Sequence, residues 1–279
     1  MYAQYWGLAE SPFQNTLDSR WFYESPGHEE ALARLLYIVE EQRQCGVLLG
    51  GTGTGKSLIL DRLQRDLSRT QREAALVNLQ GRSVHELLWE TAAALGLAPG
   101  RRELVGDLWR RLQDHLESNG FAQIPTVLMY DHLDGAEPEC GRALVRLYHL
   151  GNGGPCKLTL VFTLRNESLT HWGGLLGDMS DLRIELPELD RSQAQDYVET
   201  LLRRAGANRV LFDQLAIDEL FHQTQGIPRR INRLCDLCLL AGMADGETRV
   251  TQAMVSAAAD EVQVQRRSHR GIPWSLPTG

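Results

Sequence analysis

The stretch "GGTGTGKS", residues 50–57, follows the apolar run "CGVLL" at 45–49 and matches the pattern G-x-x-x-x-G-K-[ST]. We predict a buried strand over 45–49 and a helix over 56–69, because Leu60, Leu63 and Leu67 recur at helical spacing. A glycine-rich loop between a strand and a helix points backbone N–H groups at phosphate oxygens, and the helix N-terminus adds partial positive charge. A glycine-rich turn without a ligand is the alternative. We expect phosphate binding by the loop residues Gly50, Gly51, Thr52, Gly53, Thr54, Gly55, Lys56, Ser57 and Leu58.

Asp131 ends a second apolar run, "TVLMY" at 126–130, and is the acidic residue that such a loop requires. In proteins with this loop, the lysine neutralises the β- and γ-phosphates, and the serine ligates Mg²⁺ close to an aspartate. We therefore predict that ATP and Mg²⁺ bind here, with Lys56 at the phosphates and Ser57 and Asp131 at the metal. The alternative for Asp131 is a solvated loop aspartate.

His132 follows Asp131 at a position where ATPases of this strand order usually have a glutamate that polarises the attacking water. A neutral imidazole can hydrogen-bond a water molecule but is a weaker substitute for a fixed carboxylate. Asp134 and Glu137 are nearby carboxylates, and Glu137 is better explained as a turn residue. The hypothesis is that ATP binding is intact and that hydrolysis is slow, or uses His132 or Asp134.

The order of apolar runs along the chain predicts an α/β fold with a five-stranded parallel sheet. Strands are expected at 45–49, 74–79, 126–130, 158–163 and 182–186, with helices between the first four of them. Helices alone are expected at 191–205, 213–224, 227–242 and 250–262. We predict an α/β nucleotide-binding domain over 1–189, a small all-helical domain over 190–264 and a flexible tail over 265–279.

The composition restricts the class of protein. The net charge of −7 and the sequence pI of about 5.6 argue against a general affinity for nucleic acid. No apolar stretch approaches the ~18 residues of a membrane span, and the N-terminus lacks the regions of a signal peptide. The five cysteines fit reduced thiols, so we expect a cytoplasmic protein. Cys235 and Cys238 form a CxxC inside a predicted helix, where buried packing is favoured over zinc or redox chemistry.

Three stretches together resemble the AAA+ ATPases of the general secretion pathway component A (ExeA-type) family. They are "MYAQYWGLAESPFQNTLDSRWFYESPGHEEALARLLYIVEEQ" at 1–42, the loop "GGTGTGKS", and "TQGIPRRINRLCDLCLLAGM" at 224–243. The resemblance runs over about residues 1–262. It implies a P-loop AAA+ core with a five-stranded sheet, followed by a helical lid, with ATP between them and usually at a subunit boundary.

The resemblance also implies roles for single residues outside the loop. Arg229, in the Gly226–Arg229 step, would reach from the lid to the γ-phosphate as a sensor; a plain basic helix face is the alternative. Pro12 and Phe13 would lie near the adenine, or Phe13 would pack in a core.

Two further roles implied by the resemblance have more than one candidate. A polar residue that senses the nucleotide belongs at the end of the fourth strand, at Thr163 or Asn166. An arginine that acts on the ATP of a neighbouring subunit is expected at Arg183, with Arg146 as another candidate. Either arginine is otherwise a surface ion-pair residue.

The chain also departs from the family pattern, which has Asp-Glu where this sequence has Asp131-His132. Secretion-pathway members carry a membrane segment and a wall-binding domain that are not recognised here, so a direct role in assembling a secretion pore is not expected. The first functional hypothesis is an ATP-driven switch that forms a homo-oligomer on ATP binding and acts on a protein partner. The others are a transposition-type regulator that binds DNA and a nucleotide sensor without turnover. DNA is not favoured, although a basic edge is available at Arg101, Arg102, Arg110 and Arg111.

Overall fold

The computed structural model describes residues 2–16, 19–152 and 155–270, and these form two compact units. One unit comprises residues 26–187 and contains the sheet. The other combines the described part of residues 1–25 with the described residues after 187, and it is helical. Within the described residues, no helix is long and apolar enough to cross a membrane.

The sheet of the α/β unit has five parallel strands in the order β2-β3-β4-β1-β5. Their bounds are β1 Cys45–Gly50, β2 Glu73–Asn78, β3 Thr126–Asp131, β4 Leu158–Leu164 and β5 Leu182–Leu186. The central strands β1, β3 and β4 are buried at every position, as expected for a parallel sheet that is covered on both faces. Because the strands are parallel, the loops that follow β1, β3 and β4 meet at one edge of the sheet.

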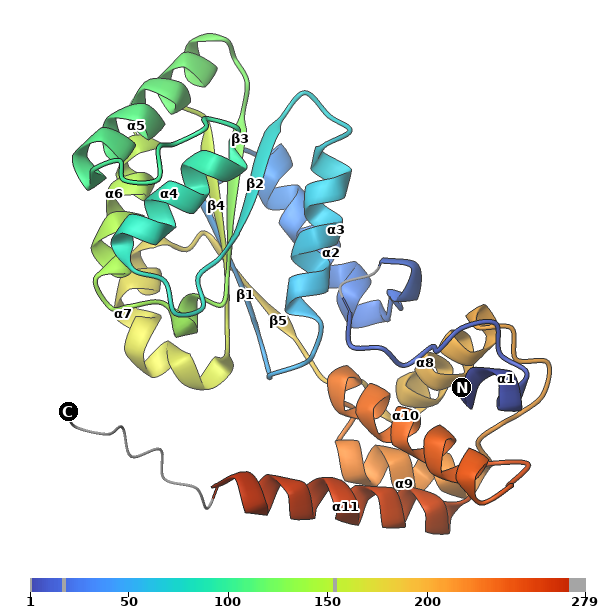
Figure 1. The fold of residues 1–279 in the computed structure, drawn as a ribbon. Helices are drawn as coiled ribbons and strands as arrows, with labels where there is room; N and C mark the ends of the chain where they lie inside the picture. The colour runs from blue at the N-terminus through green and yellow to red at the C-terminus, as the bar shows by residue number, and fades with distance from the viewer. Residues whose placement is uncertain (1, 17–18, 153–154, 271–279) are drawn as a thin grey trace. The chain divides into compact units, whose positions relative to one another are not determined.

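Helices cover both faces of this sheet (Figure 1). One face packs against α4 (Val84–Ala94), α5 (Val105–Phe121), α6 (Cys140–Leu150) and α7 (Leu169–Met179), and alternate residues of β1 such as Val47 and Leu49 enter that core. The other face is covered by α2 (Pro26–Glu40) and α3 (Lys56–Leu67). Two short 3-10 turns, Leu133–Gly135 and Asn166–Ser168, follow β3 and β4.

The helical unit consists of α8 (Arg191–Arg204), α9 (Gln214–Thr224), α10 (Pro228–Ala244) and α11 (Gln252–Arg270), together with α1 (Tyr2–Trp6) and a 3-10 turn at Ser19–Trp21. Its apolar core contains side chains from all of α8, α9 and α10 and from the first half of α11. Trp6 and Phe13 of the N-terminal segment are buried in the same core.

The predicted fold class is confirmed, and three details differ from the prediction. Helix α7 was not predicted. Residues 1–25 were predicted to belong with the α/β domain, whereas their apolar side chains pack with the helices that follow residue 187. Helix α11 continues to Arg270, through the first residues of the predicted tail 265–279, and the rest of that tail, 271–279, lies outside the described residues.

Candidate phosphate-binding site

The glycine-rich loop connects the end of β1 to the first residue of α3, as predicted. Gly55 has a φ of 111°, in the left-handed region where side chains are disfavoured. A Cβ at Gly55 would also lie 2.5 Å from Nε2 of His28, which hydrogen-bonds to the Thr54 carbonyl at 3.0 Å. His28 belongs to α2 and is almost fully buried, so it packs against the loop and fixes the backbone at Thr54 and Gly55.

Lys56 lies at the N-terminus of α3 and is only 8% exposed. Its Nζ donates to the Gly50 and Gly51 carbonyls, each at 2.8 Å, so the ammonium group is held inside the loop. Burial lowers the pKa of Lys56, while Asp131 and Asp134 act in the opposite direction. A poorly solvated cation at the N-terminus of a helix favours a multiply charged anion as a ligand.

Asp131 is 6% exposed and joins three elements at the carboxyl edge of the sheet. The Ser57 hydroxyl donates to its Oδ2 at 2.5 Å, and the Thr163 hydroxyl at the end of β4 donates to its Oδ1. Burial acts to raise the pKa of Asp131, but hydrogen bonds from His132, Ser57 and Thr163 outweigh it and lower the pKa. A hydroxyl and an ionised carboxylate in contact are hard oxygen donors, which fit Mg²⁺.

His132 adopts a left-handed backbone conformation, with φ 57° and ψ 45°. Its backbone N–H donates to Asp131 Oδ1 and to the Thr163 hydroxyl, both at 3.0 Å. Its Nδ1 lies 3.0 Å from Asp131 Oδ2, and this contact is an ion pair when the imidazole is protonated. Contact with Asp131 raises the pKa of His132, against the effect of burial. The imidazole is therefore directed at the carboxylate of Asp131.

Asp134 lies in the turn after β3, and its carboxylate is paired with Arg165. The Nε of Arg165, the first residue after β4, donates to Asp134 Oδ2 at 2.5 Å. The Asp134 side chain is 6% exposed and that of Arg165 is 48% exposed. Sequence reasoning did not find Arg165, because a sequence separation of 31 from Asp134 leaves no local pattern. The only available signal was the prediction that β3 and β4 end at the same edge of the sheet.

The structure also distinguishes between the two predicted candidates at the end of β4. Thr163 is fully buried and its hydroxyl contacts Asp131, whereas Asn166 is exposed in the following 3-10 turn. Thr163 therefore joins the site.

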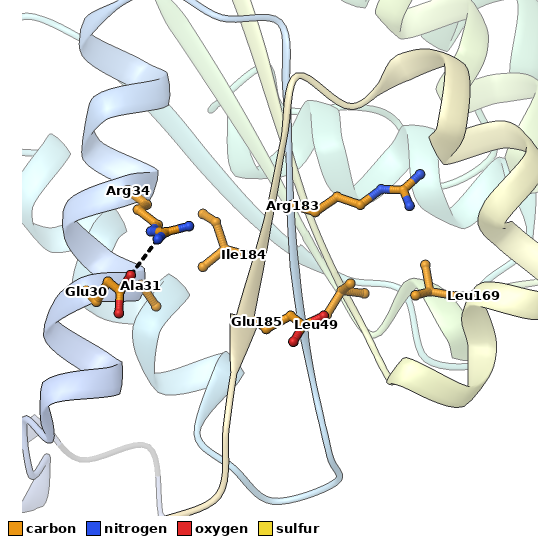
Figure 2. A pocket seen from close by; sticks show the side chains of 8 residues that line it. All are labelled: Glu30, Ala31, Arg34, Leu49, Leu169, Arg183, Ile184 and Glu185. Carbon is orange, nitrogen blue, oxygen red and sulfur yellow. Dashed lines mark hydrogen bonds and ion pairs between the residues drawn. The ribbon is translucent and has the colours of Figure 1, made fainter.

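The two arginines proposed to act on a neighbouring subunit lie on β5 and α6. Arg183 is exposed on β5, in register with Val47 rather than with Gly50, and its Nε donates to the Ser180 hydroxyl at 3.4 Å. Figure 2 shows Arg183 extending from β5 to the side opposite Arg34 and Glu30, which form their own ion pair on α2. Arg146 lies over the Trp109 ring at 4.1 Å. The role of Arg183 stays a prediction.

Arg229, Phe13 and the two cysteines of the CxxC lie in the helical unit. Arg229 is exposed in the first turn of α10, and its carbonyl accepts from Asn15 at 3.5 Å. Phe13 is 2% exposed and packs edge-to-face against Phe212, which is core packing. Cys235 and Cys238 are fully buried, and burial raises the pKa of Cys238 to about 12, as expected for packing thiols.

Two of the four arginines of the predicted basic edge are neutralised. Arg110 pairs with Asp107 at 2.9 Å and Arg111 with Glu103 at 2.8 Å. Arg101 and Arg102 remain exposed at a turn. The edge is therefore less basic than the sequence alone indicates.

Comparison with known proteins defines the class of this fold. A family model described as an AAA domain matches residues 39–171, which include the loop, Asp131 and Arg165. Cdc6p from Pyrobaculum aerophilum has a similar structure, with a TM-score of 0.73 and 18% identity over 94% of this chain and 74% of that chain. The ORC1 protein of Aeropyrum pernix, solved in complex with DNA, gives a TM-score of 0.68 and 19% identity over 92% and 72%. The chain has the P-loop AAA+ fold, and its residues 39–171 match the AAA domain model.

A curated relative gives a more specific likeness. General secretion pathway protein A of Aeromonas hydrophila is 28% identical over 270 residues, which are 94% of this chain and 48% of that protein. The chain thus spans about half the length of this relative. The predicted resemblance to general secretion pathway component A is confirmed.

Proposed function

We propose that this protein binds ATP with Mg²⁺ at the loop of residues 50–57 and hydrolyses it slowly, as a switch for a protein assembly. The proposal rests on two contacts at one edge of the sheet. Lys56 is held by the loop carbonyl of Gly50, and Ser57 donates to Asp131. Lys56 and the loop N–H groups would hold the phosphates. Ser57 and Asp131 would hold Mg²⁺, which when bound would offset charge on the phosphate oxygens.

Hydrolysis requires a base near the γ-phosphate. A water oxygen bonds to the γ-phosphorus, the bond from phosphorus to the bridging oxygen breaks, ADP leaves with that electron pair, and the water gives up a proton. The two candidate bases are both engaged: His132 faces Asp131, and Asp134 is paired with Arg165. This engagement supports slow turnover. A pure nucleotide sensor is the limiting case in which turnover is absent.

Calorimetric titration with ATP and Mg²⁺ tests the binding step. Lys56→Ala should weaken binding by ~10-fold or more, since it removes a charge-assisted contact to the phosphates. Lys157→Ala is a matched control, because Lys157 is the chain's other lysine and precedes β4 at the opposite edge of the sheet. If the folded wild-type protein gives no heat with ATP and Mg²⁺, the proposal is wrong.

A phosphate-release assay tests the turnover step. His132→Ala and Asp134→Ala should each be compared with wild type at saturating ATP. We expect slow release in wild type and a further decrease in the variant that lacks the working base. Fast release that neither variant alters would contradict the roles of His132 and Asp134.

Arg229, Arg183 and the homo-oligomer belong to the same proposal. Arg229 would contact the γ-phosphate from the helical unit, and Arg183 would act on the ATP of a neighbouring copy. Size-exclusion chromatography with light scattering, with and without ATP and Mg²⁺, should show a larger species with the nucleotide. Arg183→Ala should then lower turnover in the assembled form, whereas a mass that ATP leaves unchanged would remove the assembly step.

A second candidate function is ATP-dependent DNA binding, which the ORC1 structure in complex with DNA brings forward. The net charge of −7 and the ion pairs of Arg110 and Arg111 count against it. Retention of duplex DNA only with ATP, falling as salt is added, would favour this candidate over a protein partner. Absence of retention at low salt would exclude it.

A further inference from the structure

His28 is a buried polar side chain that contacts the phosphate-binding loop from outside the motif. It lies near the start of α2 and is 4% exposed. Its Nε2 lies 3.0 Å from the Thr54 carbonyl oxygen, at a sequence separation of 26. A carbonyl oxygen only accepts hydrogen bonds, so Nε2 carries the proton and donates to Thr54. The loop therefore depends on a donor that its own sequence does not supply.

Thr54 is held in place at two points. Its carbonyl accepts from His28, and its hydroxyl donates to the Gly51 carbonyl at 3.0 Å, across the loop. Thr54 is fully buried, so bulk water has no access to its polar atoms. Loss of the His28 donor would leave a buried carbonyl oxygen unsatisfied, which is costly enough to drive the backbone toward another conformation.

The orientation of the Thr54 carbonyl fixes the orientation of the Gly55 N–H. The peptide bond that joins these two residues is trans, so its carbonyl and its N–H point in opposite directions. Because the carbonyl points at His28 on α2, the Gly55 N–H points away from α2. In the described part of the chain, this N–H donates to no protein acceptor. Gly55 directly precedes Lys56, the first residue of α3, where unpaired N–H groups suit phosphate oxygens.

Glycine at position 55 makes this orientation easy to lose. Without a Cβ, Gly55 adopts several backbone conformations at similar cost, and its φ of 111° belongs to one of them. The His28 ring limits this freedom, since its Nε2 lies 2.5 Å from the position that a Cβ at Gly55 would take. A hydrogen bond to the carbonyl and close packing against the next residue together hold one peptide unit in one orientation.

We infer that His28 is a positioning residue for phosphate binding: it directs the Gly55 N–H toward the phosphates by holding the Thr54 carbonyl on the opposite side. This inference rests on the proposed function and deepens it, because it assigns control of the phosphate affinity to a residue outside the loop. His28 acts through the backbone and not by contact with the nucleotide. A donor that is aligned before binding needs no ordering when the ligand arrives, so loss of this alignment lowers the affinity.

Calorimetric titration with ATP and Mg²⁺, beside urea denaturation of the same samples, tests this role. His28→Leu fills most of the space of the imidazole but has no donor, and it should weaken ATP binding by ~10-fold, since a buried acceptor loses its partner. His28→Gln should restore most of the affinity, because the glutamine amide N–H reaches a position close to that of Nε2. The matched control is Ile38→Ala, since Ile38 is also buried on α2 but packs against Gly46 near the start of β1. This control should lower the urea midpoint and leave the affinity unchanged.

The outcomes separate this role from the proposed function. If wild type binds ATP and His28→Leu binds it equally well, or if His28→Gln loses as much affinity as His28→Leu, the positioning role is wrong and the nucleotide site stands. An affinity loss in Ile38→Ala as large as that in His28→Leu would mean that the loss reflects stability alone, and would also overturn the role. If folded wild type binds no ATP, both proposals fall. Should His28→Leu not fold, His28→Asn takes its place, because its shorter amide does not reach Thr54, and wild-type affinity in that variant would overturn the inference.

Discussion

At the scale of single residues, His132 shows how backbone geometry decides what a side chain can do. Its left-handed conformation is one that histidine adopts more readily than most residues, and it turns the imidazole toward Asp131. The ring then competes for a carboxylate that the proposed Mg²⁺ site requires. Both effects support the proposal of slow turnover, since the ring is occupied by Asp131 and no carboxylate stands at position 132.

His132→Glu should raise the rate of phosphate release by ~10-fold or more, since a positioned base contributes about 10²–10⁴-fold when fully in place. The left-handed backbone costs a glutamate about 1 kcal/mol, which the fold tolerates. The control is His132→Gln, because glutamine has the same length as glutamate but no basic group. Equal rates in the Glu and Gln variants would show that position 132 does not act on the water.

Residues that belong to a continuous motif could be predicted, and residues that meet only through the fold could not. The loop, Ser57 and Asp131 follow from one pattern and one strand end, and the structure brings them together. His28 and Arg165 belong to no pattern, since one is an ordinary helix residue and the other follows a strand. Their partners lie 26 and 31 positions away in the sequence.

At the scale of elements, the turn between α9 and α10 depends on two successive left-handed residues, Gln225 and Gly226. The Gly226 carbonyl accepts from Leu189 N at 3.0 Å, so the start of α8 is tied to the start of α10. Pro228 then begins α10, where its missing N–H costs nothing. The Gly-Ile-Pro step that suggested a sensor therefore also has a structural role of its own.

Gly226→Ala should destabilise the helical unit by about 2 kcal/mol or more, since a Cβ would lie 1.8 Å from the Leu189 carbonyl oxygen in addition to the cost of its positive φ. Gly246→Ala is the control: its φ is +72° and nothing lies within 4 Å of the added Cβ, so it should cost only about 1 kcal/mol. Urea denaturation measures both. Equal losses would show that the contact with Leu189 is unimportant.

Helix α4 begins with a capping box in which Ser83 and Glu86 bond each other's backbone N–H groups. These hydrogen bonds from Ser83 lower the pKa of Glu86 below its ordinary value of 4.5. A lowered pKa means that the stabilisation is complete above about pH 5 and is lost as the pH falls through the folded-state pKa. Glu86→Gln should therefore flatten the loss of stability in acid, measured by thermal unfolding between pH 3 and 6, and an unchanged profile would contradict this.

Sequence periodicity predicted the strands well, since short apolar runs bounded by turns mark a buried parallel sheet. All five strands of the α/β unit lie within one or two residues of their predicted bounds. Helix α7 was missed because its sequence, "LTHWGGLLGDM", contains a glycine pair that weakens the helical pattern. Trp172 and Leu176 pack in the core, and this packing stabilises a helix whose intrinsic helix propensity is low.

At the scale of the whole molecule, the N-terminal segment is part of the helical unit's core. The Trp6 indole N–H donates to the Leu239 carbonyl at 2.8 Å, and Ala9 N donates to the Ala205 carbonyl at 2.7 Å. The prediction placed this segment with the α/β domain because the family resemblance implies that Pro12 and Phe13 lie near the adenine. An apolar pattern predicts that a segment is buried, but it does not identify the core in which the segment is buried.

Trp6→Ala should lower the free energy of unfolding of the helical unit by about 3–5 kcal/mol, the usual cost of removing a buried tryptophan side chain. Tyr5→Ala is the control, because Tyr5 is 41% exposed and its hydroxyl donates to the Glu247 carbonyl at the surface. Chemical denaturation followed by circular dichroism measures both. Similar losses in the two variants would mean that the segment is not integral to that core.

The interleaving of the two units sets an order of events during synthesis. Residues 2–16 leave the ribosome before the α/β unit does, yet their partners in α8–α10 lie beyond residue 190. At roughly 5–20 residues per second, the segment waits about 10–40 s with Trp6 and Phe13 in water while the α/β unit emerges and folds. During this interval the apolar side chains of residues 2–16 are available to chaperones, until α8–α10 have been synthesised.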